Sequence, residues 1–358
     1  MSSSLLQYVD AFALRWRRVI VWRSLRNLGL GLVLVAAAIF LATATATATA
    51  TGESNIAFDV VLKTLANQLL GMTYDLNVID RGIVWEYRLS RAIVAASCGA
   101  ALAVCGVILQ SLLRNVLVDP YILGISAGAS AGAVAVAIAG IGAGALSMSA
   151  GAFLGAVLSF ALVVGLARMT GQIILAGIAG AQLFHALSSL MITKSANAEG
   201  ARGIMFWMLG NLSGVRWSDV SLAVPVAVGG VLIAGLYTRA LDAFTFGSQS
   251  AAALGIAVTR VKVVLIALTA LMTAVMVSMV GSIGFVGLVI PHAARYLVGV
   301  RHAVLLPTSA VMGAVFLILS DILSRVVVPG QVLPIGVITA LIGAPAFALI
   351  LIRGTRAL

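Results

Sequence analysis

Residues 89–112 read LSRAIVAASCGAALAVCGVILQSL, an apolar run long enough to cross a bilayer as one α-helix. Its only charged residue, Arg91, stands near its start. Outward from this run, windows of about 20 apolar residues predict ten spans. They lie at residues 28–50, 89–112, 121–141, 146–168, 172–192, 219–238, 261–281, 283–299, 303–325 and 332–352. The predicted fold is therefore all-α and polytopic, with a single membrane domain over residues 28–352.

Composition supports a lipid-facing surface. The chain has 358 residues, of which 62% are hydrophobic and 9% charged, and its mean hydropathy is +1.15. Ordinary soluble domains carry roughly 25% charged residues, so the charges here are too few to cover a water-facing exterior. The net charge of +11 does not indicate nucleic acid, because the basic residues form no groove pattern.

The regions outside the main spans are short. Residues 1–27 are a basic segment predicted to be cytoplasmic, and we expect the run at 28–50 to be a retained first helix rather than a cleaved signal peptide. Residues 56–71 have apolar side chains at helical spacing but are too short to span, so we place them at the membrane surface. Residues 353–358 form a predicted cytoplasmic tail.

The distribution of Lys and Arg predicts orientation. With ten spans and the N-terminus inside, the inner basic residues are Arg15, Arg17, Arg18, Arg23, Arg26, Arg114, Arg168, Arg239, Arg260, Lys262, Arg295, Arg301, Arg353 and Arg356. The outer ones are Lys63, Arg81, Arg88, Arg91, Lys194, Arg202, Arg216 and Arg325, balanced by the outer acids. The whole net charge then falls inside, as the positive-inside rule requires. Both termini are predicted to be cytoplasmic, in a bacterial inner membrane.

The sequence lacks the residues that several other classes of function require. No carboxylate lies in mid-span, which argues against a proton- or sodium-coupled carrier. None of the three lysines follows a glycine, so the chain has no P-loop, and it has neither an H-E-x-x-H motif nor a Cys/His cluster. We therefore expect no catalysis, no metal site and no cofactor in this chain. A secondary transporter with an inverted repeat and a membrane-embedded enzyme remain the alternatives.

Two motifs precede the third span. In R-L-S-R, Arg88 and Arg91 project from nearby faces of a helix start and suit pairing with carboxylates, although they could equally be interfacial anchors. In GVILQSLLRNVLVDPYILG (106–124), a helix gives way to a polar turn with Asn115 and Leu117 before Pro120. Taken alone, this second motif indicates only a tight cytoplasmic hairpin.

Two further motifs follow. The inner loop 239–258 is predicted to contact a partner protein through apolar residues at helical spacing, punctuated by glycines. Its candidate residues are Leu241, Phe244, Gly247, Ala252, Leu254 and Gly255. In VGSIGFVGLVIPHAAR (280–295), Gly284 lies in a glycine repeat and Pro291 breaks the helix before His292, a pattern typical of helices that line a path. His185, alone in the fifth span, is either an interhelical hydrogen-bond donor or a pathway residue that faces haem.

Together these segments resemble the permease family of type II ABC importers for iron-siderophores, haem and cobalamin, the FecCD-type family. The resemblance covers roughly residues 85–352. It adds Trp207-x-x-Gly210, Asp321-x-x-x-Arg325, Pro334-Ile335-Gly336 and Gly343-Ala344-Pro345 to the motifs above. Ser90 and Val116 replace prolines of the family pattern, and Val332 replaces an acidic residue of the outer contact surface.

The resemblance implies a homodimer of ten-helix subunits, each built as two five-helix inverted repeats, with two ATPase subunits below and a periplasmic binding protein above. It assigns binding-protein docking to Arg88, Arg91 and Arg325, and the cytoplasmic gate to Asn115, Leu117, Thr170 and Gly171. The coupling helices that receive ATPase motion fall within 241–255. ATP and Mg would be used by the partner ATPase. We expect an iron chelate, as a siderophore or haem, rather than cobalamin as cargo.

Overall fold

The computed structural model describes residues 56–138, 140–141, 147–195 and 198–354. The predicted segment 1–27, the predicted span 28–50 and residues 355–358 of the tail lie outside this part of the chain. The regular structure of the described residues is helical throughout. This confirms the all-α prediction.

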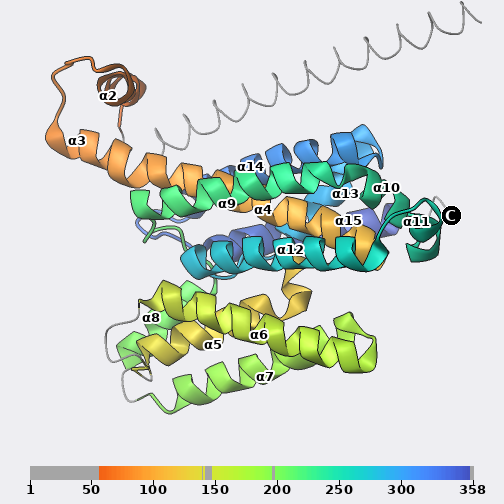
Figure 1. Ribbon diagram of the computed structural model, residues 1–358. Helices are drawn as coiled ribbons and strands as arrows, with labels where there is room; N and C mark the ends of the chain where they lie inside the picture. Colours follow the sequence, from red (N-terminus) through yellow and green to blue (C-terminus); the bar gives the residue numbers. More distant parts are fainter. Residues whose placement is uncertain (1–55, 139, 142–146, 196–197, 355–358) are drawn as a thin grey trace, which may run out of the picture. The chain divides into compact units, whose positions relative to one another are not determined.

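Within the described residues, the nine predicted spans from 89–112 onward correspond to helices (Figure 1). The helices are α2 (Phe58–Leu70), α3 (Val78–Gly82), the π-helical η1 (Ile83–Leu89), α4 (Ser90–Leu113), the 3-10 helix η2 (Pro120–Leu123), α5 (Ile125–Ala137), α6 (Met148–Thr170), α7 (Ile173–Thr193), α8 (Ala198–Met208), α9 (Trp217–Leu236), α10 (Thr238–Phe244), α11 (Ser248–Ala253), α12 (Val258–Val280), α13 (Val286–Val298), α14 (His302–Val326) and α15 (Ile335–Gly354). Within the described ranges, six helical stretches are long and apolar enough to cross a membrane, and α5, α13 and α15 are shorter apolar helices.

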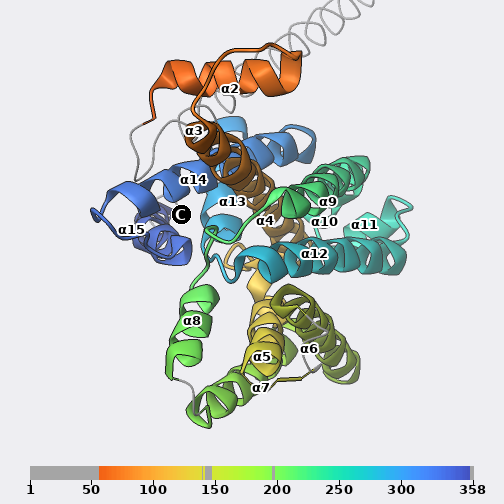
Figure 2. The same ribbon diagram turned by 90° about the vertical axis from the view of Figure 1, so that its left-hand side faces the viewer.

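Helix α4 is the central element. It packs against α9, α12, α13 and α14, and its side chains are buried along almost its entire length. Helices α5, α6 and α7 pack on one another and join the rest through contacts of α5 and α6 with α12, as the two views show (Figure 2). A helix that is apolar on all sides must be surrounded by protein or lipid, and α4 is surrounded by protein.

Glycines allow the closest approaches of α4. A Cβ atom on Gly99 would overlap the carbonyl oxygen of Gly313 in α14, and one on Gly106 would overlap that of Gly287 in α13. Small residues at membrane helix interfaces bring backbones into contact and so gain van der Waals energy. The glycines of the central run therefore determine which helices surround it.

The helix ends fall into two sets. The α2 end contains α2, the first turn of α4 and the last turn of α14, while the α10 end contains α10, α11 and the opposite ends of those helices (Figure 1). Of the predicted outer residues, Arg88, Arg91 and Arg325 lie at the α2 end. Of the predicted inner residues, Arg114, Arg239 and Arg301 flank helix ends at the α10 end. The two groups of basic residues thus separate as the charge pattern predicts.

Two local features differ from the predictions. Helix α8 was not predicted, because its stretch AEGARGIMFWM is amphipathic and too short to span. The predicted span 283–299 begins late, at Val286, since residues 281–285 leave the helix: Gly281 and Phe285 both have positive φ, 73° and 69°.

Candidate functional site

At the α2 end, Asp321 joins two arginines of the predicted docking set. Its Oδ1 accepts a hydrogen bond from Arg91 Nε at 2.6 Å, and its Oδ2 forms an ion-pair contact with Arg325 Nη2 at 3.0 Å. The Asp321 side chain is 1% exposed, and Arg91 also donates to Ser213 Oγ. The cluster therefore holds α4 and α14 together and balances part of the buried positive charge.

The remaining predicted docking residue is Arg88, which is buried in η1. The exposed residues nearby are different ones: the guanidinium of Arg216 lies 4.6 Å from the ring centroid of Tyr87, which is 50% exposed. Trp217 Nε1 donates to the carbonyl oxygen of Trp85 at 3.1 Å, which fixes the start of α9 against η1. The arginines of the predicted docking motif are thus largely covered by their own chain.

The predicted gate residues occupy two turns at the ends of helices. Asn115 Oδ1 accepts from the backbone N–H of Leu117, and Leu117 itself is 52% exposed. Gly171 ends α6 with φ 71°, and Thr170 Oγ1 accepts from the N–H of Gln172. Both turns follow the C-terminal ends of helices, and each uses a side-chain oxygen to satisfy a free N–H.

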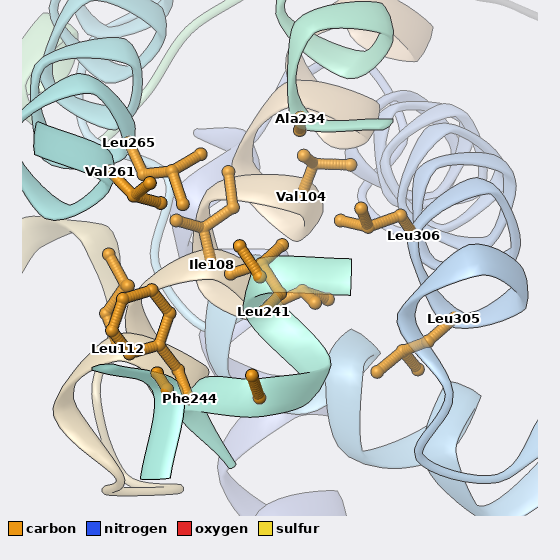
Figure 3. Close-up of a cluster of buried hydrophobic side chains, with 14 of the residues drawn as sticks. Val104, Ile108, Leu112, Ala234, Leu241, Phe244, Val261, Leu265, Leu305 and Leu306 are labelled. Atoms are coloured by element: carbon orange, nitrogen blue, oxygen red, sulfur yellow. The ribbon is translucent and has the colours of Figure 1, made fainter. Parts of the chain in front are cut away.

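The structure corrects part of the predicted partner surface. Leu241 and Phe244 of α10 are not exposed but 0% and 1% accessible, and they pack with Ile108 and Leu112 of α4 (Figure 3). Leu254, Ala252 and Gly255 are exposed as predicted, and so is Phe246 at 75%, which the sequence reasoning missed. Helical spacing alone does not say which apolar side of a short helix faces its own chain.

The inner loop 239–258, the predicted coupling loop, also meets the end of α4. Gly247 separates α10 from α11 with φ 103°. A Cβ placed on it would lie 3.3 Å from Arg114 Nη1. Arg114 itself ends α4 in the left-handed conformation, with φ 50°. The loop and the predicted gate turn are therefore neighbours.

Three remote motifs converge beside the predicted pathway segment. The N–H of Asn211 donates to Val280 O, that of Ile335 to Gly210 O, and that of Gly336 to Leu209 O. Tyr121 OH accepts from the N–H of Ile283, and Ser126 Oγ donates to Ser282 Oγ at 2.9 Å. Within the non-helical segment 281–285, the backbone N–H of Ile283 is thus satisfied by a side chain from a distant part of the chain, as irregular backbone at membrane depth requires.

The pathway candidates divide into two places. Gly284 lies in the non-helical segment 281–285. The predicted break at Pro291 is wrong, because α13 continues through Pro291 and the chain leaves the helix before Val286 instead. His292, the next residue of α13, makes an edge contact with Phe347 of α15, with ring centroids 5.8 Å apart. His185 lies on α7 and is exposed. The structure thus brings three of the four together and leaves His185 on a separate helix.

Comparison with known proteins agrees with this arrangement. The FecCD transport family matches residues 32–353. The cobalamin import system permease protein BtuC of Halobacterium salinarum is 40% identical over 75% of this chain and 73% of its own length. The Fe(3+) dicitrate transport system permease protein FecD of Escherichia coli is 35% identical over 76% of this chain and 85% of its own. An inward-facing structure described as a metal-chelate type ABC transporter has a TM-score of 0.78 at 27% identity, covering 90% of this chain and 99% of that one.

Proposed function

The chain belongs to the FecCD transport family, and from that membership we propose that it carries a metal chelate across a bacterial inner membrane as one of two identical permease subunits. It is a multi-pass membrane protein and the permease of an ABC importer, a machine that also includes ATPase subunits and a binding protein. The family match, which extends over residues 32–353, is the observation that carries this proposal.

The orientation follows from charge. Basic residues gather at the α10 end, so we place that end and both termini in the cytoplasm. The exposed residues Phe246 and Leu254, at 75% and 72%, then face the ATPase. ATP and Mg bind to that separate subunit. This chain supplies the path and the two docking faces.

For cargo, the relatives support one chemical class. BtuC imports cobalamin and FecD transports iron dicitrate, and both cargoes are chelated metals. Our preference for an iron chelate over cobalamin stays a prediction. Titrating the co-encoded binding protein with ferric siderophores, haem and cobalamin, each followed by tryptophan fluorescence, tests it. Tight binding of cobalamin alone would contradict the preference.

The complex itself is testable by ATP hydrolysis. Co-expressed permease and ATPase should purify as a two-plus-two assembly, and the loaded binding protein should stimulate its ATPase activity. An assembly with one permease, or an activity indifferent to the binding protein, would contradict the proposal.

Docking of the binding protein is proposed at Arg88, Arg91 and Arg325. Support comes from their place at the α2 end, where Asp321 holds two of them within one cluster. We expect Arg88→Gln to weaken binding-protein affinity about tenfold at low salt, because the variant lacks the charge that we propose pairs with a carboxylate of the binding protein. Arg81→Gln is the control, since Arg81 is exposed and lies in α3, seven residues before Arg88. Equal affinities of the two variants would remove Arg88 from the docking set.

A further inference from the structure

Three polar side chains from three helices form a continuous chain at the α10 end. Asp242 Oδ1, on α10, lies 2.7 Å from His302 Nδ1 and accepts the backbone N–H of His302 at 2.9 Å. His302 Nε2, at the start of α14, lies 2.6 Å from Ser111 Oγ on α4. Because the carboxylate only accepts, Nδ1–H donates to it, and a neutral ring leaves Nε2 to accept the single Ser111 hydroxyl proton, for which Val107 O at 2.8 Å is the competing acceptor. The coupling loop is thereby hydrogen-bonded to the central helix.

The order Ser–His–Asp also occurs in hydrolases, where the serine attacks a substrate. Here the side chains of Ser111 and His302 are buried, with residue exposures of 8% and 2%. Ser111 lies within α4, where Val107 O is 2.8 Å from its Oγ. A nucleophile needs an open approach and free donors for an oxyanion, and the interior of a packed helix provides neither. The geometry therefore suits mechanical connection rather than chemistry.

Gln110, the residue before Ser111 in α4, extends the connection to other helices. Gln110 Nε2 donates to Val118 O at 3.3 Å and to Gly287 O at 3.1 Å, and its Oε1 accepts from Arg295 Nη1 at 2.6 Å. Val118 is the last residue before Asp119 in the turn that contains Asn115 and Leu117. One turn of α4 thus binds the coupling loop on one side and the predicted gate on the other.

Apolar packing alone would not fix this register. Leu241 and Phe244 of α10 share a cluster with Ile108 and Leu112 of α4 (Figure 3), but apolar contacts are non-directional. Hydrogen bonds constrain both distance and angle. The polar chain is therefore the part of the interface that ties a displacement of α10 to a displacement of α4.

We propose that Asp242, His302 and Ser111 are positioning residues that transmit movement of α10 to the C-terminal turn of α4, and that Gln110 passes it to the gate turn. This inference rests on the proposed function, in which α10 and α11 receive the motion of the ATPase.

The test measures cargo imported per ATP hydrolysed by the full complex of permease, ATPase and binding protein in lipid vesicles. The probe is whichever radiolabelled chelate, ferric siderophore or cobalamin, the binding protein takes up. Ser111→Ala should lower the ratio about fivefold, the effect of one lost buried hydrogen bond, and Asp242→Ala should lower it at least as much because it removes the acceptor of two N–H groups of His302. Asp242→Asn should keep the ratio, because the amide oxygen accepts the same two N–H groups. Ser97→Ala is the matched control, since Ser97 lies on the same helix α4, is 8% exposed like Ser111, and donates its hydroxyl to Ile93 O four residues earlier.

A merely structural role would lower thermal stability and yield without changing the ratio. The double variant Ser111→Ala/Asp242→Ala should be no worse than Asp242→Ala alone, since all break the same chain. Wild-type ratios in both single variants, or additive losses in the double one, would overturn the inference. If Asp242→Ala does not assemble, Ser111→Ala decides alone, because it removes one hydroxyl from an otherwise intact helix. Failure of the wild-type complex to import with ATP would instead refute the proposed function.

Discussion

At the scale of single residues, Asp321 is the most consequential charge at the α2 end. It is 1% exposed and faces Arg91 and Arg325. Removing one partner of a buried ion pair leaves the other charge unpaired and costs about 3–5 kcal/mol. We therefore expect Asp321→Asn to lower the apparent melting temperature of the purified permease strongly. Thermal unfolding followed by size-exclusion chromatography measures it.

The control for that variant is Asp59→Asn. Asp59 pairs with Lys63 at 2.9 Å, but both side chains are exposed, at 60% and 44%. Surface pairs contribute little to stability, so its melting temperature should match that of the wild type. Equal melting temperatures for the two variants would show that the Asp321 cluster does not stabilise the fold.

The ionisation of Asp119 makes the free energy of unfolding depend on pH. It lies in the turn before η2, and burial raises its pKa from 3.8 to about 6, although its bond from the N–H of Tyr121 acts in the opposite direction. The folded state then binds more protons than the unfolded one. Its contribution to the unfolding free energy is fully present below pH 3.8 and is lost as the pH rises through about 6.

We therefore expect Asp119→Asn to be more thermostable than the wild type at pH 7.5, with a smaller difference at pH 5. Asparagine keeps the oxygen that accepts from Tyr121 and removes the buried charge. Melting curves at the two pH values check this. A difference that is larger at pH 5 would contradict the raised pKa.

At the scale of elements, the existence of the helices could be predicted from the sequence. Which side of a short helix packs against the rest of the chain could not. Long apolar runs such as 89–112 are unambiguous because only a helix satisfies its own backbone in lipid. By contrast, Leu241 and Phe244 look like partner-seeking residues in the sequence, yet they are buried against α4. Whether a short helix between two spans packs on its own chain depends on residues more than a hundred positions away.

Two phenylalanines of the coupling loop test which of its side chains pack on the permease and which contact the ATPase. Phe244 is 1% exposed and Phe246 is 75% exposed. Phe244→Ala should destabilise the permease by about 3–5 kcal/mol, since it empties a packed core site. Phe246→Ala should leave the melting temperature unchanged and weaken co-purification of the ATPase. Loss of stability in Phe246→Ala with intact ATPase binding would reverse the two assigned roles.

The packing of α4 on α14 is tested at Gly99. A Cβ there would overlap the carbonyl oxygen of Gly313, so Gly99→Val should force the helices apart and abolish the monodisperse folded species. Gly165→Val in α6, where nothing lies within 4 Å of the added Cβ, is the matched control. Equal yields of folded protein by fluorescence-detected size exclusion would contradict the close approach.

At the scale of the whole molecule, much of the site could be predicted because its motifs are local in sequence. The turn at Asn115 follows from a short pattern, and the separation of basic residues to two ends follows from their count along the chain. The sequence predicts the helix break at Pro291, whereas the structure has it at residues 281–285. The pairing of Arg91 with Asp321 and of Ser111 with His302 could not be predicted, because hydrogen bonds between distant helices leave no periodic signal.

The most direct test of the central claim is uptake into vesicles that contain this permease, with or without its ATPase. The loaded binding protein is supplied outside, and ATP is either enclosed or replaced by a proton or sodium gradient. We expect the radiolabelled chelate to accumulate only when the ATPase and enclosed ATP are both present. Accumulation driven by an ion gradient through this chain alone would contradict this expectation.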